Sequence, residues 1–424
     1  MSNASYEDYR IKGIDYLNTV FGGDAVERAV ENTMRFMVEV PAWQLWSGFG
    51  GGGRFEGAGM SGAARTTGEI AQDAGLIHRL TGSTPCIGQH MLWFFSGDRM
   101  YADYDRAVRV RDELETEGVR MGSVNPTYFL AGSEDGSFSA MDRGTRERYI
   151  EQTVLGARIA AELGNGILSL WFPDGTNYPG QRELQDKIGL LKENVSLFWD
   201  RTPREVKSRL DRVLFEYKVF EPGTYSTTVP DWGTARELSR LVGDWGAVLV
   251  DLGHHHHGTN IEQIVAHMIA FGIRGGFHFN TRYAADDDHS VQADYGLARL
   301  FHELLRGNAI FNDDTAENWS FGLDQMPRAE ELIPAVLKSV DALKRSVAKA
   351  SLLDVAEQRI CQEAFDVIGS NVECERALLH ADTGPVVMES YVRLGLHPVP
   401  LEAFHESGYQ KRIVGERSQP LKNL

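Results

Sequence analysis

Eight short stretches in the middle of the chain are apolar at nearly every position and rich in β-branched and aromatic residues. They are VPAWQLW (40–46), STPCIGQHMLWF (83–94), RMGSVNPTYF (120–129), GILSLWF (166–172), RVLFEYK (212–218), AVLVDLG (247–253), GGFHFN (275–280) and NWSFGLD (318–324). Strands that are buried on both faces of a parallel sheet have such near-continuous apolar sequences. The pattern therefore predicts eight buried strands.

Between these stretches, apolar residues recur at the spacing of amphipathic helices. The clearest cases are residues 103–118, 145–164, 183–200, 260–272 and 294–307, and some of them stop at a glycine suited to end a helix. Strands that alternate with helices in this way predict an α/β fold, a parallel sheet closed into a (β/α)8 TIM barrel. An open, doubly wound sheet is the alternative on pattern alone.

Two regions fall outside the repeat. Residues 1–36 are predicted to form an N-terminal helical segment, residues 37–328 the catalytic barrel, and residues 329–424 a C-terminal helical extension. We expect the extension to pack on the barrel or on a neighbouring subunit, because no sharp linker separates it.

Composition narrows the class of protein. The hydrophobic content of 42% and charged content of 24% are ordinary for a soluble globular protein. No apolar run approaches the roughly 20 residues of a membrane helix, and the N-terminus has no secretory signal pattern. The three cysteines are scattered and odd in number, which favours a cytoplasmic protein without disulfides.

A net charge of −17 argues against a nucleic-acid partner and leaves cations and neutral small molecules as expected ligands.

Polar residues gather where four neighbouring predicted strands end, at the face of a barrel that carries chemistry. Glu216 and Lys218 alternate on one strand, and Asp251, His278 and Asp324 follow on the next three. Three carboxylates and an imidazole could meet there only around a cation, because their mutual repulsion and desolvation would otherwise be costly. The oxygen-rich set suits Mn²⁺ or Mg²⁺, and Zn²⁺ less well.

A second group of ligand types lies nearby in the sequence. His254 follows Asp251 by three residues, and the segment TRYAADDDH (281–289) places Asp286 and Asp288 two residues apart. His254, Asp286 and Asp288 are a candidate second metal site, with Asp251 as the bridge between two ions. Taken singly, each feature has a simpler interpretation as a core histidine or a solvated acidic loop; their convergence on successive strand ends favours metal binding.

The run of four histidines, His254 to His257, resolves into one predicted ligand and three neighbours. We expect His255 to pack beneath the site. His256 and His257 are expected to be surface or subunit contacts without a chemical role.

These motifs resemble a known family. EYK (216–218), VDLGHH (250–255), GGFHFN (275–280), the DDD of residues 286–288 and a strand-eight aspartate are similar to the L-rhamnose isomerases of the bacterial broad-specificity type, within the xylose isomerase-like barrels. WFPDGTNYPGQ (171–181) and YSTTVPDWGT (225–234) also resemble that family's segments. The resemblance extends from about residue 36 to residue 415.

The resemblance implies a role for each matching residue. Glu216, Asp251, His278 and Asp324 match the ligands of a structural metal, and His254, Asp286 and Asp288, with Asp251 bridging, match those of a catalytic metal. Lys218 matches the lysine at the O1/O2 end of the sugar, His90 the histidine linked to ring opening, and Trp93 and Trp171 the aromatic walls. Trp93, Phe94 and Phe129 are the candidate contacts for the methyl group of L-rhamnose. Phe55 matches an aromatic residue that enters the neighbouring subunit's site in a homotetramer.

The function implied is aldose–ketose isomerisation of an unphosphorylated monosaccharide with two divalent cations per subunit. Mn²⁺ is the first expectation, with Mg²⁺, Co²⁺ or Zn²⁺ as alternatives. Lys218, Asp324 and His90 are the candidate catalytic residues, with hydride and enediol routes both open. The loop FGGGGRFEGAGMSG (49–62) and the segment HMLWFFSGD (90–98) depart from the family, so D-ribose, D-allose and L-lyxose stand beside L-rhamnose as substrates.

Three other functions share some of these features. A ketose 3-epimerase has the same barrel but needs neither the EYK lysine nor the DDD loop. A metal-dependent endonuclease would need a positive surface, and a non-catalytic sugar-binding module would not require two sets of metal ligands.

Overall fold

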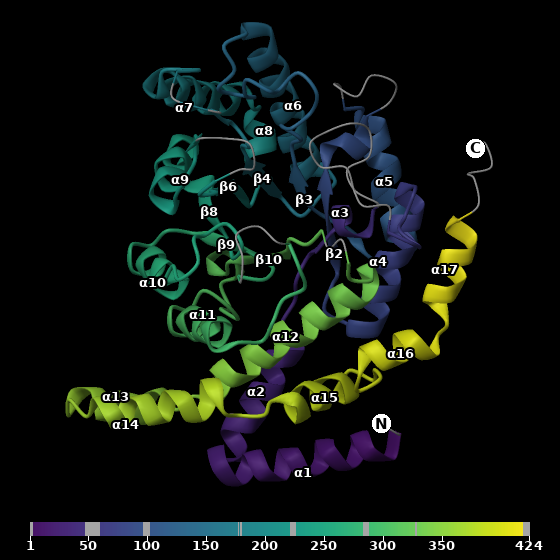
Figure 1. The fold of residues 1–424 in the computed structure, drawn as a ribbon, viewed down its shortest axis with the longest axis vertical. Coiled ribbons are helices and arrows are strands. Elements are labelled where there is room, and N and C mark those ends of the chain that lie inside the picture. Colours follow the sequence, from purple (N-terminus) through teal and green to yellow (C-terminus); the bar gives the residue numbers. More distant parts are fainter. Residues whose placement is uncertain are drawn as a thin grey trace.

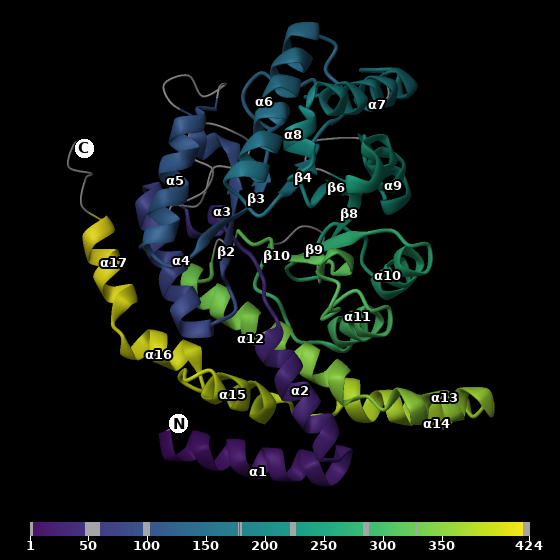
Figure 2. The ribbon, with the colours of Figure 1, turned by 180° about the vertical axis from the view of Figure 1, so that it is seen from behind.

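A closed barrel of eight parallel strands forms the centre of the protein. The computed structural model describes residues 3–46, 60–95, 102–176, 178, 180–220, 226–282, 288–326 and 329–418. The strands follow the order β1-β2-β3-β4-β6-β8-β9-β10. The first and last strands meet because the amide of Glu39 donates to Phe321 O, and that of Leu323 to Glu39 O, each at 2.9 Å. The predicted (β/α)8 fold is confirmed, and the open sheet is excluded (Figures 1 and 2).

Each strand of the barrel coincides with one of the eight predicted stretches, and only β8 begins one residue before its stretch. The strands are β1 (Val40–Pro41), β2 (Cys86–His90), β3 (Arg120–Asn125), β4 (Ile167–Trp171), β6 (Arg212–Glu216), β8 (Gly246–Asp251), β9 (Gly275–Phe279) and β10 (Ser320–Leu323). A small antiparallel pair, β5 (Gly175–Thr176) and β7 (Ser226–Thr227), joins two of the connecting segments.

The first predicted stretch is a strand over only two residues. After Pro41 the chain turns into the helix α3 (Ala42–Leu45), all of whose residues are buried. The second stretch likewise ends in a 3-10 turn, η1 (Met91–Phe94). A buried helical turn has the same continuous apolar pattern as a buried strand, so the sequence did not separate the two.

Helices surround the barrel, as the amphipathic pattern predicts (Figure 2). They are α4 (Thr67–Thr81), α5 (Tyr104–Thr116), α6 (Arg143–Glu162), α7 (Leu184–Arg201), α8 (Arg204–Lys207), α9 (Trp232–Ser239), α10 (Ile261–Ala270) and α11 (Tyr295–Arg306), with 3-10 turns η2 (Arg240–Trp245) and η3 (Thr315–Glu317). Side chains cap several of them: Asn260 accepts from Gln263 N at α10, and Asp294 accepts from Leu297 N at α11. Such caps satisfy first-turn amides that have no partner within the helix.

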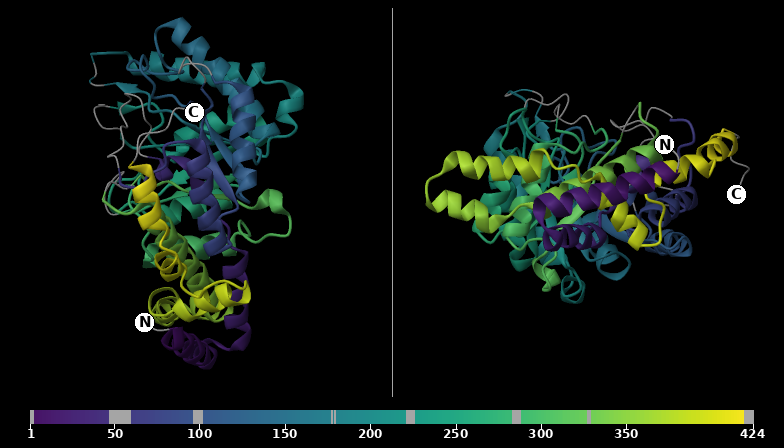
Figure 3. Two further views of the ribbon diagram at one scale, coloured as in Figure 1. Left: turned by 90° about the vertical axis from the view of Figure 1, so that its right-hand side faces the viewer. Right: turned by 90° about the horizontal axis from the view of Figure 1, so that it is seen from below.

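The remaining helices cross the outside of the barrel on one side (Figures 1 and 3). They are α1 (Asn3–Phe21), α2 (Gly23–Arg35), α12 (Leu332–Leu352), α13 (Val355–Glu363), α14 (Val367–Cys374), the π-helical turn η4 (Glu375–Leu379), α15 (Gly384–Arg393), α16 (Pro400–Glu406) and α17 (Tyr409–Arg417). None of the described helices is long and apolar enough to span a membrane.

The C-terminal extension is held to the barrel of its own chain. Asp73 of α4 is only 2% exposed and accepts from Arg417 at 2.7 and 2.8 Å and from the Tyr409 hydroxyl at 2.7 Å. Gln44 donates to Leu332 O at 3.1 Å, which ties the start of α12 to the helix after β1. The helical extension therefore packs on the barrel, one of the two arrangements expected from sequence.

Candidate metal centre and active site

The strand register brings four predicted ligands to the same end of the barrel. Glu216 is the last residue of β6, and Asp251 is the last residue of β8. Asp251 pairs with His278 of β9, and His278 pairs with Gly322 of β10, two residues before Asp324. All four therefore lie at the carboxyl ends of the strands, where barrel enzymes carry their chemistry.

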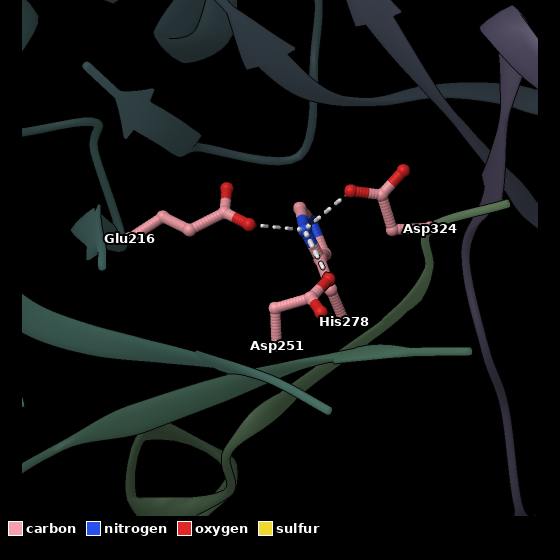
Figure 4. Close-up of side chains that lie close together, drawn as sticks. All are labelled: Glu216, Asp251, His278 and Asp324. Carbon is pink, nitrogen blue, oxygen red and sulfur yellow. Dashed lines mark hydrogen bonds and ion pairs between the residues drawn. The ribbon is translucent and has the colours of Figure 1, made fainter. Parts of the chain in front are cut away.

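The three carboxylates converge on one nitrogen of the imidazole (Figure 4). The Nδ1 atom of His278 lies 3.3 Å from Glu216 Oε1, 3.5 Å from Asp324 Oδ2 and 3.9 Å from Asp251 Oδ2. One ligand atom from each of the four residues falls within 4.8 Å of all the others, and three of the four residues are buried. Three oxygens and one nitrogen at these separations form a set that could hold a divalent cation.

The same side chains perturb one another's protonation. Burial, together with repulsion from Asp324 and Glu216, raises the pKa of Asp251 to about 7. Burial alone would lower the pKa of His278, but Glu216 and Asp324 outweigh it and raise that pKa well above the usual value. Burial would raise the pKa of Asp324, yet hydrogen bonds with His278 and Trp43 lower it. Without a cation the cluster thus retains protons at its centre, where a metal ion would supply the positive charge instead.

Trp43 and Asn280 hold the carboxylates in position, and neither was a predicted site residue. The indole Nε1 of Trp43, on α3, donates to Asp324 Oδ1 at 2.7 Å. Asn280 Nδ2 lies 3.0 and 3.2 Å from the two oxygens of Asp251, which also accepts from Gly253 N at 2.7 Å. These contacts orient the lone pairs that would face a metal. Asn280 could have been predicted from the sequence, because it alternates with His278 on one strand and therefore faces the same side. No sequence pattern pointed to Trp43.

The histidine run divides as the spacing predicts. His254 is 4% exposed, with Nδ1 at 3.2 Å from Glu216 Oε1 and Nε2 at 4.0 Å from Asp251 Oδ1. His255 points into the core, where its Nε2 lies 2.7 Å from the Tyr217 hydroxyl. His256 and His257 are exposed. Only His254 therefore reaches the cluster.

Part of the second predicted metal set lies in the same cavity. A space of 60 Å³ among the described residues is bounded by both His254 and Asp288. Asp286 lies outside the described residues, as does Phe55. Asp288 has a φ of 51°, an uncommon left-handed conformation for a residue other than glycine. The structure thus brings His254 and Asp288 to the cavity of the four-residue cluster.

Aromatic residues and a lysine complete the cavity. The His90 ring lies 4.9 Å from that of Trp43, 5.4 Å from that of Phe129 and 6.1 Å from that of Trp93. Burial lowers the pKa of His90 to about 3, so the imidazole is neutral at neutral pH. Lys218 is 4% exposed, and its Nζ lies 5.1 Å from the centre of the Trp171 ring. Five of the predicted sugar contacts lie on one wall of the cavity or directly behind it: His90, Trp93, Phe129, Trp171 and Lys218.

The partly exposed carboxylate of Glu39 also lies in the barrel, and no pattern in the sequence predicted it. Glu39 accepts from the Ser123 amide at 2.7 Å and from the Ser123 hydroxyl. A Cβ atom at Gly122 would lie 1.8 Å from its carboxylate and one at Gly88 2.5 Å from it. Burial raises the pKa of Glu39 although the hydrogen bonds from Ser123 oppose the rise. The two strand glycines thus leave the space that this carboxylate fills.

Comparison with known proteins gives similarity along most of the chain. No family model matches it. It is 28% identical over 402 residues to a probable sugar isomerase of Mesorhizobium japonicum and 29% identical over 404 residues to a probable sugar isomerase of Rhizobium meliloti. Each alignment covers 93% of this chain and 88% of the relative. An L-rhamnose isomerase of Bacteroides thetaiotaomicron is 23% identical over 367 residues, 80% of this chain and 81% of that protein.

Solved structures share the barrel. A D-allulose 3-epimerase from Methylomonas sp. superposes with a TM-score of 0.51, covering 74% of this chain and 98% of the epimerase at 11% identity. At this identity the likeness is one of fold. The chain is therefore a TIM barrel that is similar in sequence to proteins named as sugar isomerases.

Proposed function

We propose that the protein is a metal-dependent aldose–ketose isomerase that acts on an unphosphorylated monosaccharide. The observation that carries the proposal is the convergence of Glu216, Asp251 and Asp324 on His278 at the carboxyl end of the barrel. The similarity to probable sugar isomerases over 93% of the chain supports the reaction class.

The donor set fits a divalent ion, with Mn²⁺ as the proposed metal. Glu216, Asp251, His278 and Asp324 would hold one ion, and His254 and Asp288, with Asp286, would hold a second beside Asp251. A bound divalent cation supplies Lewis-acid polarisation of the sugar's oxygens. Mg²⁺, Co²⁺ and Zn²⁺ have compatible preferences for oxygen and imidazole ligands.

The chain's own residues bind and orient the sugar in this proposal. Lys218 lies on the wall of the cavity and donates to the O1/O2 end, where charge develops as hydrogen moves between C2 and C1. His90 is neutral and hydrogen-bonds a hydroxyl during ring opening. Trp93, Phe129 and Trp171 exclude water and contact the apolar face of the sugar. In the enediol route Asp324 takes the C2 proton and returns it to C1, while the O2 proton moves to O1. In the hydride route hydrogen moves from C2 to C1 with its electron pair, and only the O2 proton has to be transferred to O1.

Assembly and substrate range are part of the same proposal. A homotetramer with Phe55 entering the neighbouring site follows the resemblance to L-rhamnose isomerases. The division at residues 36 and 328 follows the limits of the strand and helix repeat. L-Rhamnose is the first candidate substrate, in line with the relative of Bacteroides thetaiotaomicron that bears its name. D-Ribose, D-allose and L-lyxose are the others.

The decisive experiment is a conversion assay with defined metal content. The purified protein is stripped with a chelator, reloaded with Mn²⁺, and incubated with each of the four aldoses, and the sugars are separated by chromatography. A ketose product that requires Mn²⁺ is expected. Lys218→Met should lower kcat while Mn²⁺ binding persists, because the lysine contacts sugar and not metal.

Matched variants make the result specific. Glu216→Gln should abolish both Mn²⁺ binding and turnover, whereas His256→Ala, at an exposed position of the same loop, should alter neither. Absence of ketose from every aldose, with Mn²⁺ bound, would overturn the isomerase proposal. Interconversion of ketoses at C3 would instead identify an epimerase.

A further inference from the structure

A cavity of 1030 Å³ lies outside the barrel, remote from the metal centre. It is bounded by the turn between α1 and α2, the end of α11, the end of α12 and the start of α13. Figure 1 shows the start of α2 beside the junction of α12 and α13. We call this cavity the α2–α13 groove. None of the residues on its walls belongs to the site proposed for the sugar.

The groove is basic in a strongly acidic protein. Arg28, Arg306, Arg359 and Arg376 line it, against two carboxylates, in a chain with a net charge of −17. Arg28 donates only to the backbone oxygen of Ser351, at 3.1 and 3.3 Å. Within the described part of the chain, the side chains of Arg306 and Arg359 have neither a hydrogen bond nor an ion pair. Three exposed guanidinium charges around one cavity are therefore not neutralised by carboxylates of the described residues.

The backbone adds donors at the same place. The helix α2 begins at Gly23, and its N-cap residue Gly22 provides no side-chain cap. Both glycines line the groove, and space is open where each would carry a Cβ atom. The first-turn amides of a helix lack partners within the helix and carry partial positive charge, so they favour an anion.

A buried imidazole also lines the groove. His302 of α11 is 2% exposed, and its side chain makes no hydrogen bond with any described residue. Burial, with Arg299 and Arg306 adding to it, lowers its pKa to about 4, so the ring is neutral and offers one N–H donor. Because this neutral imidazole lines the groove, its ring can hydrogen-bond a ligand that enters.

We propose that the α2–α13 groove binds a small anion that carries a phosphate group. Guanidinium forks, helix amides and an imidazole approach from several sides, which suits the several acceptor oxygens of phosphate. The volume exceeds that of inorganic phosphate and leaves room for an organic part against Phe21, Leu305 and Leu353. The net charge of −17 repels a nucleic-acid polymer, so the ligand is a small phosphorylated metabolite.

The test is calorimetric titration of the full chain with inorganic phosphate and with glucose 6-phosphate at constant ionic strength. Both should bind, and the double variant Arg306→Gln/Arg359→Gln should weaken binding by about tenfold or more, because two charge-assisted contacts are lost. Asp24→Asn should tighten binding, because it removes a carboxylate from the groove. Binding should persist in Glu216→Gln, so this result is independent of the proposed isomerase activity.

The control is Arg109→Gln, a change at an exposed arginine on α5 that lies outside the groove. Unchanged affinity in this variant is expected. The proposal is overturned if neither phosphate compound gives more heat than chloride, if the double variant binds as tightly as the wild type, or if Arg109→Gln weakens binding equally.

Discussion

Metal binding at the four-residue cluster should release protons, and its affinity should therefore fall steeply as the pH is lowered. In the metal-free protein His278 keeps a proton because its pKa is raised well above the usual value, and the pKa of Asp251 is raised to about 7. A divalent ion can use these groups only after their protons leave. Protons and metal thus compete, so lower pH weakens binding.

The size of the effect follows from the number of protons displaced. Loss of the His278 proton costs about tenfold in affinity for each pH unit below its pKa. Asp251 adds about a further tenfold per unit below pH 7. Between pH 7 and pH 6 Asp251 alone should lower the affinity for Mn²⁺ by about tenfold, or about 1.4 kcal/mol, and the proton held by His278 should make the fall steeper.

Calorimetry can measure both the affinity and the protons. Mn²⁺ is titrated into chelator-stripped protein at pH 6, 7 and 8 in two buffers with different heats of ionisation, and the difference gives the number of protons released. We expect about one more proton to be released at pH 6 than at pH 8, because Asp251 holds a proton only below about pH 7. Glu205→Gln, at an exposed glutamate away from the cavity, is the control and should leave the profile unchanged. Affinity that is constant between pH 6 and 8 would refute the reasoning, since it would mean that neither group holds a proton in the metal-free site.

Two other predictions concern residues that support the site and the extension. Trp43→Phe removes the N–H that donates to Asp324. Calorimetry should then show that Mn²⁺ binds about 10- to 100-fold more weakly, because the carboxylate is no longer oriented. Undiminished affinity would show that the contact does not orient the carboxylate. Asp73→Asn leaves the buried guanidinium of Arg417 without its carboxylate, and urea unfolding should show a loss of about 3–5 kcal/mol. Arg412→Gln, which breaks an exposed pair, should cost less than about 1 kcal/mol, and equal losses in the two variants would contradict the assignment.

The sequence was most informative about the metal ligands. Glu216, Asp251, His278 and Asp324 each stand at the end of an apolar stretch, and parallel strands bring such ends to one face of a barrel. The three-residue spacing from Asp251 separated His254 from its histidine neighbours, and the structure places those neighbours in the core or at the surface. Roles for these residues follow from chemistry and resemblance, and the assays above test them.

The sequence was less informative where a buried strand and a buried helical turn have the same apolar pattern. The stretch VPAWQLW is a strand over two residues and then a helical turn, and only the turn carries Trp43 to Asp324. Glu39 illustrates the same limit, because the glycines that make room for it lie 49 and 83 positions away in the sequence. Neither position has a local signature, since both depend on how distant strands pack.

The sequence by itself determined the order of strands and helices, the α/β class and the residues at the strand ends, because hydrophobic periodicity and strand polarity are local properties. Only the tertiary structure decided that the sheet closes and which distant groups come together: Trp43 bonds Asp324, Asp73 bonds Arg417, and Arg28, Arg306 and Arg359 line one groove. Those distances depend on the packing of elements far apart in the chain, which no window of sequence contains.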